Sequence, residues 1–108
     1  MCGRYALTAT PEDILHFLSV IDIEDFPARF NIAPTQPILI VAAEGHHQPG
    51  SNLPPRRALL ARWGFIPGWV KDVRDFPLLI NARAETAHEK ASFRGAMRHR
   101  RILVPASG

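Results

Sequence analysis

Ile38-Leu39-Ile40-Val41-Ala42-Ala43 is the longest apolar run of the 108-residue chain. Its length suits a buried strand and falls well short of the roughly 18 residues that a membrane-spanning helix needs. The loose segment 45–55 follows it, with two glycines, two adjacent histidines, serine and asparagine. Arg57–Trp63 then resumes as a strand pattern. We therefore expect two strands joined by a surface loop, in a single small domain.

On the N-terminal side, a strand is expected over Cys2–Thr8 and a helix after it. Thr10 has the character of a capping residue, and Pro11 suits the first helical position. The two acids that follow favour the positive end of a helix dipole. One face of this helix is expected to pack on the core through Ile14, Leu15, Phe17 and Leu18. A turn is expected within Phe30–Gln36, around Pro34.

On the C-terminal side, the pattern indicates short elements joined by turns, as ten prolines and seven glycines favour. Gly64–Trp69 predicts a tight turn, and Leu78–Ile80 a short buried strand. Ala84–Arg100 predicts a helix interrupted near Ser92 and Gly95, with Ser92 as a candidate cap. Ile102–Val104 predicts a last strand.

Charge is distributed unevenly along the chain, although the net value is only +3. The first 54 residues hold two basic and six acidic side chains, and the remaining 54 hold eleven basic and four acidic ones. All but two of the basic residues are arginine, whose planar fork suits phosphates and stacks on bases. An anionic partner is one interpretation, and a solvated basic face is the other.

The N-terminal sequence and the single cysteine argue against a secreted protein and against a disulfide-bonded one. No basic segment followed by an apolar stretch opens the chain, so we do not expect secretion. A single cysteine cannot form an internal disulfide, which fits a reducing cytoplasm. The histidines and Cys2 show no zinc spacing, and no phosphate-cradling glycine loop is present, so neither metal nor cofactor is expected.

Cys2 is the residue with the most distinctive chemistry. Met1 is removed when the next side chain is small, which would leave an α-amine and a thiol on adjacent carbons. The amine has a reference pKa of about 8, so part of it is neutral near pH 7. Such an aminothiol condenses with an aldehyde to a Schiff base and then a thiazolidine. In an extended strand Arg4 lies on the same side as Cys2 and can favour the thiolate. An incidental second-position cysteine is the alternative.

Two further segments hold candidate binding residues. Trp63-Gly64-Phe65-Ile66-Pro67-Gly68-Trp69 can present aromatic faces to unstacked bases, or both tryptophans can be core anchors; we expect one buried and one partly exposed. In the segment 81–86, Asn81, Arg83 and Glu85 share one face if the chain is extended. An amide beside a guanidinium suits a sugar–phosphate group. A helix entry with a structural Arg83–Glu85 pair is the alternative.

Four blocks together resemble the SRAP family of SOS-response-associated peptidases. They are Met1-Cys2-Gly3-Arg4-Tyr5, Arg29-Phe30-Asn31-Ile32-Ala33-Pro34-Thr35, the 63–69 segment and Asn81-Ala82-Arg83-Ala84-Glu85-Thr86. Their order and spacing agree with the family, and they cover the whole chain, residues 1–108. They correspond only to the first half of the family's single domain.

The resemblance implies an α+β fold, a pseudo-barrel of mostly antiparallel short strands with a few short helices. It implies an enzyme-like sensor of abasic sites, which acts on single-stranded DNA in the bacterial cytoplasm and nucleoid. Cys2, as the N-terminal residue, would form a thiazolidine crosslink with the ring-opened sugar and so protect the lesion. The residues that the resemblance assigns are catalytic Cys2 and Asn81, and DNA-binding Arg4, Arg83, Trp69, Pro34 and Trp63.

The chain departs from the family at one point. The family's catalytic glutamate and histidine match positions beyond Gly108, so we expect a truncated domain with impaired capture. We also expect self-association through an edge left unpaired at Ile102–Val104. Two other functions stay open: a thiol peptidase that removes its own N-terminal residues, and a non-covalent binder of single-stranded DNA.

Overall fold

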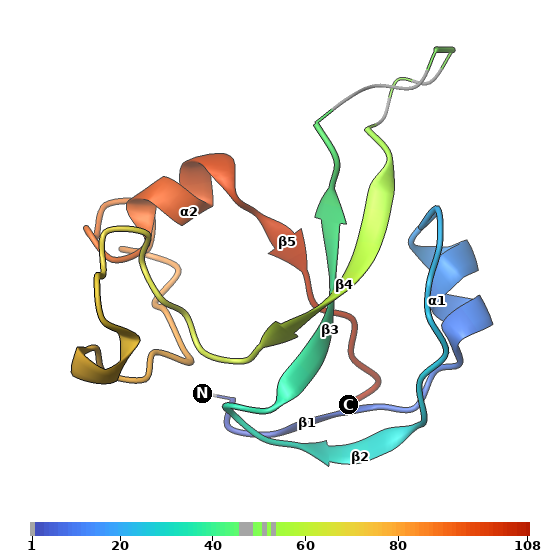
Figure 1. The fold of residues 1–108 in the computed structure, drawn as a ribbon, viewed down its shortest axis with the longest axis horizontal. Coiled ribbons are helices and arrows are strands. Elements are labelled where there is room, and N and C mark those ends of the chain that lie inside the picture. The colour runs from blue at the N-terminus through green and yellow to red at the C-terminus, as the bar shows by residue number, and fades with distance from the viewer. Residues whose placement is uncertain (1, 46–48, 51, 53) are drawn as a thin grey trace.

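The computed structural model describes residues 2–45, 49–50, 52 and 54–108. Over these residues the fold is α+β, as the resemblance implies, with short helices and strands in two open sheets rather than a closed barrel (Figure 1). The elements follow one another as β1 (Tyr5–Leu7), α1 (Pro11–Phe17), β2 (Arg29–Ile32), β3 (Pro37–Ala43), β4 (Arg56–Arg62), the 3₁₀ turn η1 (Val73–Asp75), α2 (Arg94–His99) and β5 (Ile102–Leu103).

The apolar run 38–43 forms most of β3, the central strand of a three-stranded sheet with the order β4-β3-β5. β3 and β4 pair antiparallel from Pro37 opposite Arg62 to Ala43 opposite Arg56, so the expected strand pair is confirmed. The two adjacent histidines of the connecting loop lie outside the described residues. On the other side of β3, Val41 faces Leu103 of β5.

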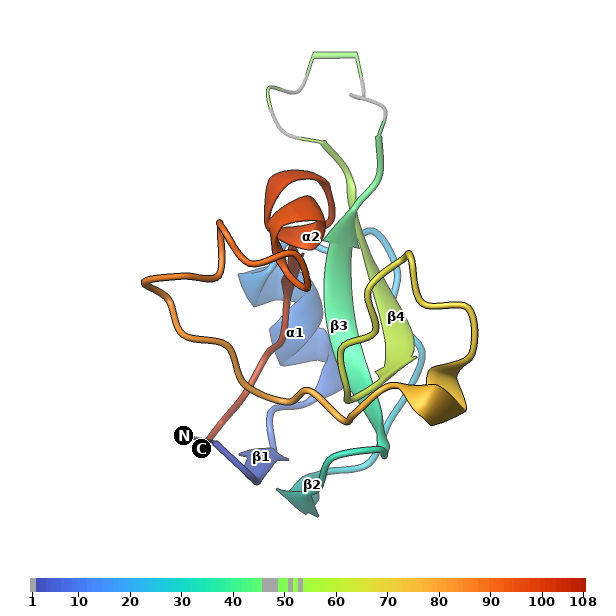
Figure 2. The same cartoon turned by 90° about the vertical axis from the view of Figure 1, so that its left-hand side faces the viewer.

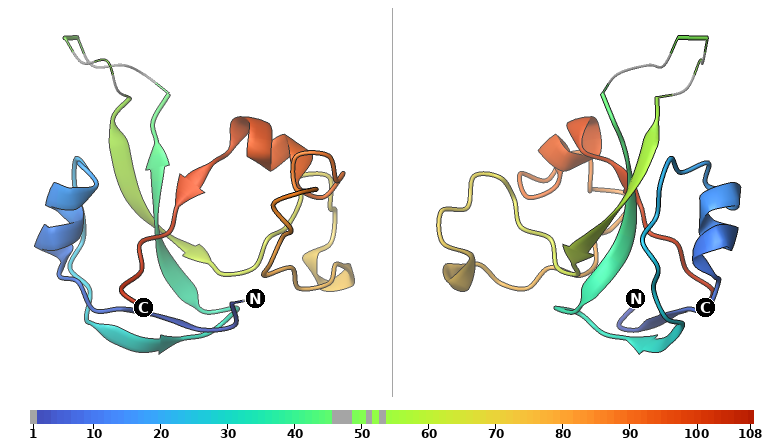
Figure 3. Two further views of the ribbon diagram at one scale, coloured as in Figure 1. Left: turned by 180° about the vertical axis from the view of Figure 1, so that it is seen from behind. Right: turned by 45° about the vertical axis from the view of Figure 1, so that its right-hand side comes forward.

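β1 and β2 form a second, two-stranded sheet, along which the end of the chain also lies (Figure 3). Ser107 donates its backbone N–H to the Ala6 carbonyl at 2.8 Å, and its hydroxyl accepts from the N–H of Thr8 at 2.9 Å. β1 is therefore held on both sides, by β2 and by the segment that follows β5. Cys2 lies three residues before the start of this strand.

The core is formed by buried residues of β1, β2, β3 and α1. Figure 2 shows β1 and β2 near the lower end of β3. Alternation along β3 buries Ile38 and Ile40 on one face, because successive side chains of a strand point to opposite faces. These two isoleucines pack with residues from the other elements, namely Leu7, Ile14 and Ile32.

Helix α1 begins as predicted and packs differently from the prediction. Thr10 caps it through a reciprocal capping box with Asp13, and Pro11 is its first residue. Ile14 is buried, whereas the expectation that Phe17 packs on the core is wrong, because its ring is 85% exposed. Phe17 lies on the same side of the helix as Ile14, but it borders an open hollow between α1 and the segment after β5, so its ring is not covered.

Three predicted elements have different extents in the structure. β1 begins at Tyr5 and not at Cys2, because the chain bends at Gly3. Leu78–Ile80 is not a buried strand: Leu79 makes an isolated bridge to Phe65, and Leu78 is half exposed. The predicted turn within Phe30–Gln36 is confirmed at 33–36 only, since β2 continues through Ile32.

The predicted helix over Ala84–Arg100 is confirmed only for α2 (Arg94–His99). The stretch before it is a series of turns, and Ser92 does not cap α2, which has no side-chain cap. Tertiary contacts explain the difference. The Phe93 ring packs on Phe65 at 5.3 Å, and the Ala91 carbonyl faces the Trp69 indole N–H at 3.5 Å. These contacts hold the segment against the 64–69 turn in a shape that a straight helix does not have.

Among the described residues, no helix is long and apolar enough to cross a membrane.

Candidate functional site

Cys2 and Asn81 lie together at the surface, although 79 positions separate them in the chain. The Cys2 backbone nitrogen donates to Asn81 Oδ1 at 3.3 Å, and Asn81 Nδ2 donates to the Cys2 carbonyl at 3.3 Å. One amide side chain thus holds both polar groups of the Cys2 backbone. The thiol of Cys2 is free and the residue is exposed, so it is open to a ligand from solvent.

The position of Asn81 depends on the aromatic turn. The Phe65 N–H donates to the Leu79 carbonyl at 2.8 Å, which fixes the chain two residues before Asn81. Asn81 also lines a cavity of about 530 Å³ between the sheet and the 79–101 segment. Its walls include apolar side chains of β3 together with Trp63 and Phe65, and three arginines also contribute to its lining, Arg62, Arg100 and Arg101. The cavity is therefore mainly apolar, with basic residues among those that surround it.

Arg4 lies immediately before β1 and is exposed. Its Nη1 donates to Asn31 Oδ1 across the two strands at 3.0 Å. Both residues are exposed, and the register between β1 and β2 shifts by one residue between the Tyr5–Ile32 and Leu7–Arg29 pairs, so β2 has an irregularity at Phe30 and Asn31. Sequence reasoning did not single out Asn31, although its place between Phe30 and buried Ile32 in a strand pattern was a usable signal.

Tyr5 and Trp63 form the apolar support beneath this surface. Their rings meet edge to face at 5.4 Å, and both pack partly buried against the core. Burial raises the pKa of the Tyr5 phenol, and the nearby Arg29 guanidinium works in the opposite direction. The Tyr5 hydroxyl is buried with no hydrogen-bond partner among the described residues. Trp63 is the more buried tryptophan but is only partly buried, so the expectation of one buried tryptophan is not met.

Trp69 is the exposed tryptophan, with 62% of its surface accessible. Its ring is nearly perpendicular to that of Phe76, and the two ring centroids are 5.7 Å apart. Gly68 beside it admits Arg100: a Cβ at Gly68 would come within 3.3 Å of an Arg100 guanidinium nitrogen. The turn thus places an aromatic surface next to a cation.

Arg83 and Pro34 lie outside the hydrogen-bonded pair of Cys2 and Asn81. Arg83 is exposed, and the part of the chain that the structure describes contains no Arg83–Glu85 ion pair, which argues against that alternative. The Arg83 carbonyl accepts from Thr86 and Ala87 at the start of the turns. Pro34 is half-buried in the turn between β2 and β3. Over the described residues, neither Arg83 nor Pro34 is hydrogen-bonded to Cys2 or Asn81.

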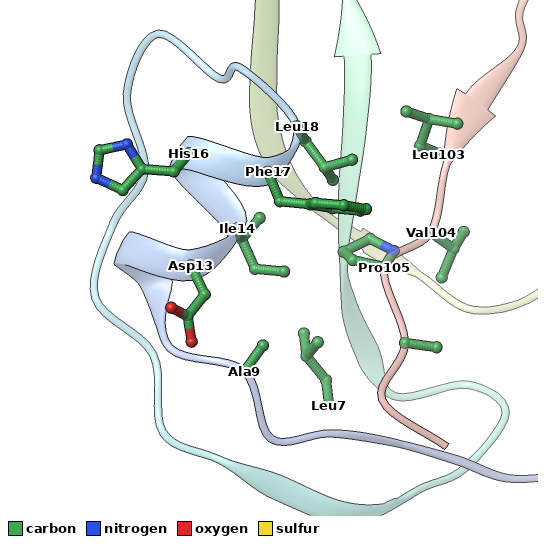
Figure 4. A pocket seen from close by; sticks show the side chains of 11 residues that line it. Leu7, Ala9, Asp13, Ile14, His16, Phe17, Leu18, Leu103, Val104 and Pro105 are labelled. Carbon is green, nitrogen blue, oxygen red and sulfur yellow. The ribbon is translucent and has the colours of Figure 1, made fainter.

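A second hollow, of about 770 Å³, lies away from Cys2, between α1 and the segment that follows β5 (Figure 4). Figure 4 shows Phe17 and Leu18 on one side of it and Leu103, Val104 and Pro105 on the other. Leu7 and Ile14 lie at its base, where it meets the core. The lining is predominantly apolar, in contrast to the surroundings of Cys2.

Comparison with known proteins identifies the class to which this fold and site belong. Residues 1–108 match the family described as SOS response associated peptidase (SRAP), and the chain belongs to that family.

Three relatives illustrate the similarity. The chain is 37% identical over 115 residues to the abasic site processing protein YedK of Escherichia coli, across all of this chain and 46% of that protein. It is 35% identical over 109 residues to the abasic site processing protein YoqW of Bacillus subtilis, across 98% of this chain and 45% of that protein. It is 24% identical over 126 residues to the abasic site processing protein HMCES of Xenopus tropicalis, across all of this chain and 38% of that protein. The chain thus spans less than half the length of these relatives.

Proposed function

We propose that this chain captures abasic sites in single-stranded DNA through a covalent bond to Cys2. The observation that carries the proposal is the reciprocal pair between Cys2 and Asn81, which fixes an exposed aminothiol precursor at the surface. Relatives along almost the whole chain are named abasic site processing proteins. An abasic sugar in its ring-opened form carries an aldehyde, the group with which an N-terminal cysteine condenses.

The chemistry proceeds in two balanced steps after removal of Met1. The neutral α-amine of Cys2 adds to the aldehyde carbon, and loss of one water leaves a Schiff base. The Cys2 sulfur then attacks the carbon of the C=N bond, and the thiol proton ends on the nitrogen. The product is a five-membered thiazolidine, and no oxidant or reductant is consumed. Because the sulfur and the nitrogen belong to one residue, ring closure is intramolecular, which favours it strongly.

Asn81 orients the amine in this scheme. Its Oδ1 faces the Cys2 nitrogen, so it accepts a hydrogen from the amine and directs the amine's lone pair. Its Nδ2 holds the Cys2 carbonyl and so fixes the residue as a whole. Arg4 and Arg83, both exposed, neutralise phosphates of the strand, and the exposed ring of Trp69 receives a base. Trp63 supports the site from below through Tyr5.

The test is a crosslinking assay with the Met1-processed chain and single-stranded DNA that holds one abasic site. We expect an adduct that survives denaturing electrophoresis for the parent and none for Cys2→Ala. Cys2→Ser is the matched control, since it keeps a processed N-terminus and a similar size but lacks the thiol that closes the stable ring. Mass spectrometry confirms the free α-amine in all three proteins.

The two alternative functions predict different results, the first in the same assay and the second with a chain that carries an added N-terminal extension. A non-covalent binder holds intact and abasic strands equally well, in a salt-dependent manner, and Cys2→Ala changes nothing. A peptidase that acts on its own leader removes an added N-terminal extension without any cellular enzyme, and Cys2→Ala stops it. Equal crosslinking by the parent and Cys2→Ala would overturn the proposal.

A further inference from the structure

Arg4 and Asn31 form a pair whose chemistry differs from that of the ion pairs elsewhere in the chain. Arg4 Nη1 donates to the neutral amide oxygen of Asn31 at 3.0 Å. Arg74, in contrast, is held by both carboxylate oxygens of Asp72, with Nε–Oδ1 at 3.1 Å and Nη2–Oδ2 at 2.9 Å. A carboxylate partner neutralises a guanidinium and occupies its fork. An amide orients the guanidinium without neutralising it.

The N–H groups of Arg4 that do not bind Asn31 can form hydrogen bonds to a phosphate. A guanidinium has five N–H groups, and the bond to Asn31 uses one of them. Arg4 is exposed, and its other donors have no further partner among the described residues, so they and the charge remain available to a ligand from solvent. Phosphate oxygens bind such a fork with two parallel hydrogen bonds. A fixed fork loses less side-chain entropy on binding than a free one.

The charge of Arg4 also stands out against its surroundings. The first 54 residues contain only two basic side chains against six acidic ones. The other base, Arg29, is bound to the Pro37 carbonyl and to Gln36 Oε1, and so ties β2 to the turn that follows. Arg4 is thus the base of this acidic half whose donors face solvent, and it lies two residues from Cys2.

We propose that Asn31 is a positioning residue, which holds the Arg4 guanidinium without neutralising it, ready for a phosphate of the strand next to the captured sugar. The inference rests on the proposed function for the identity of the strand. It adds a residue of β2 to the site and explains why its side chain is an amide: a carboxylate at this position would hold Arg4 equally well and cancel its charge.

The experiment measures the salt dependence of binding to an intact single strand, and separately the rate of adduct formation on an abasic strand. Removal of one phosphate contact lowers the slope of log K against log salt by about 0.7 on single strands. We expect Asn31→Asp and Arg4→Ala each to lower the slope by about that amount. Asn52→Asp, in the loop between β3 and β4, makes the same chemical change at a distance and is the matched control.

Asn31→Ala separates positioning from charge. It leaves Arg4 charged, so we expect the slope of the parent but a capture rate about threefold to tenfold lower, the effect of removing one hydrogen bond. Asn31→Gln keeps an amide and is expected to recover part of that rate, which a merely structural role of the β1–β2 contact would not produce. Thermal melts of all variants show whether each is folded at the assay temperature.

The outcomes distinguish this inference from the proposed function. A slope for Asn31→Asp equal to that of Asn52→Asp overturns the inference, as does an unchanged capture rate for Asn31→Ala. A parent that forms no adduct while Asn31→Asp still lowers the slope refutes covalent capture and supports phosphate positioning. An adduct on the parent with no effect at Asn31 leaves covalent capture standing and removes Asn31 from the site.

Discussion

Two exposed regions of this molecule, the Cys2–Asn81 surface and the hollow beside α1, are open to solvent for different reasons. At Cys2 the exposed groups are polar and held by reciprocal hydrogen bonds, so water can surround them at little cost. In the hollow, the exposed groups are apolar side chains such as Phe17, Leu103 and Val104. Contact between water and clustered apolar surface is unfavourable, so a hollow of this kind is stabilised when another surface covers it.

Strand β1 links the two regions. Its Leu7 end lines the hollow, and the segment before its other end holds Cys2. The two exposed regions therefore suit different kinds of contact, because polar groups surround Cys2 and apolar side chains line the hollow. Cys2 beside a fixed amide fits a reactive site, whereas the apolar hollow that Phe17 and Leu103 line from opposite sides fits a surface for contact with protein. The self-association expected at Ile102–Val104 belongs to the second region, because β5 is an edge strand of the described sheet and its Leu103 lines the hollow.

Helix α1 offers a matched pair of variants for the apolar region. Ile14→Ala removes a buried side chain of the core and is expected to lower the free energy of unfolding by about 2–5 kcal/mol. Phe17→Ala removes an exposed ring three residues later and is expected to cost less than about 0.5 kcal/mol in the monomer. Urea unfolding at low protein concentration measures both values.

Sedimentation of the same proteins tests whether the hollow associates. We expect the parent to form larger species as its concentration rises, and Phe17→Ala to reduce them. Equal destabilisation by the two variants at all concentrations would show that Phe17 is covered within one chain, contrary to the structure. A parent that stays monomeric and unfolds cooperatively would refute self-association.

Asn81 provides the corresponding test of the polar region. Asn81→Ala removes both hydrogen bonds to Cys2, and we expect the rate of adduct formation to fall about tenfold, with little change in the melting temperature because both groups are exposed. Asn52→Ala in the loop is the control. A large drop in stability with an unchanged rate would mean that Asn81 supports the fold and not the reaction.

The smallest expected effect is on the pH dependence of stability, through the phenol of Tyr5. Burial raises the pKa of its phenol in the folded state above the value of 10.0 in the unfolded chain. Above about pH 10 the Tyr5 phenol therefore loses its proton more readily in the unfolded chain than in the folded one. The free energy of unfolding falls as the pH rises through this range. Tyr5→Phe has no such proton and is expected to flatten the decline in melts between about pH 9 and 11. An equal decline in both proteins would assign it to other groups.

Local patterns in the sequence were good guides wherever neighbouring residues settle the structure. The β3–β4 pair follows from an apolar run and a second strand pattern, and the start of α1 follows from Thr10 and Pro11. The predictions were wrong where distant contacts decide. The 84–93 segment follows the 64–69 turn instead of its own helical pattern, and Phe17 has a helical spacing that suits a core it does not reach.

The sequence alone was enough to establish the family, an α+β fold of short elements, and Cys2 as the residue with unusual chemistry. These properties depend on residue identity and local spacing, which a linear sequence contains in full. The pairing of Cys2 with Asn81, the bond from Arg4 to Asn31, and the apolar hollow beside α1 were decided only by the tertiary structure. Each joins residues of separate elements, and the geometry between such elements is set by the packing of the core rather than by the order of residues along the chain.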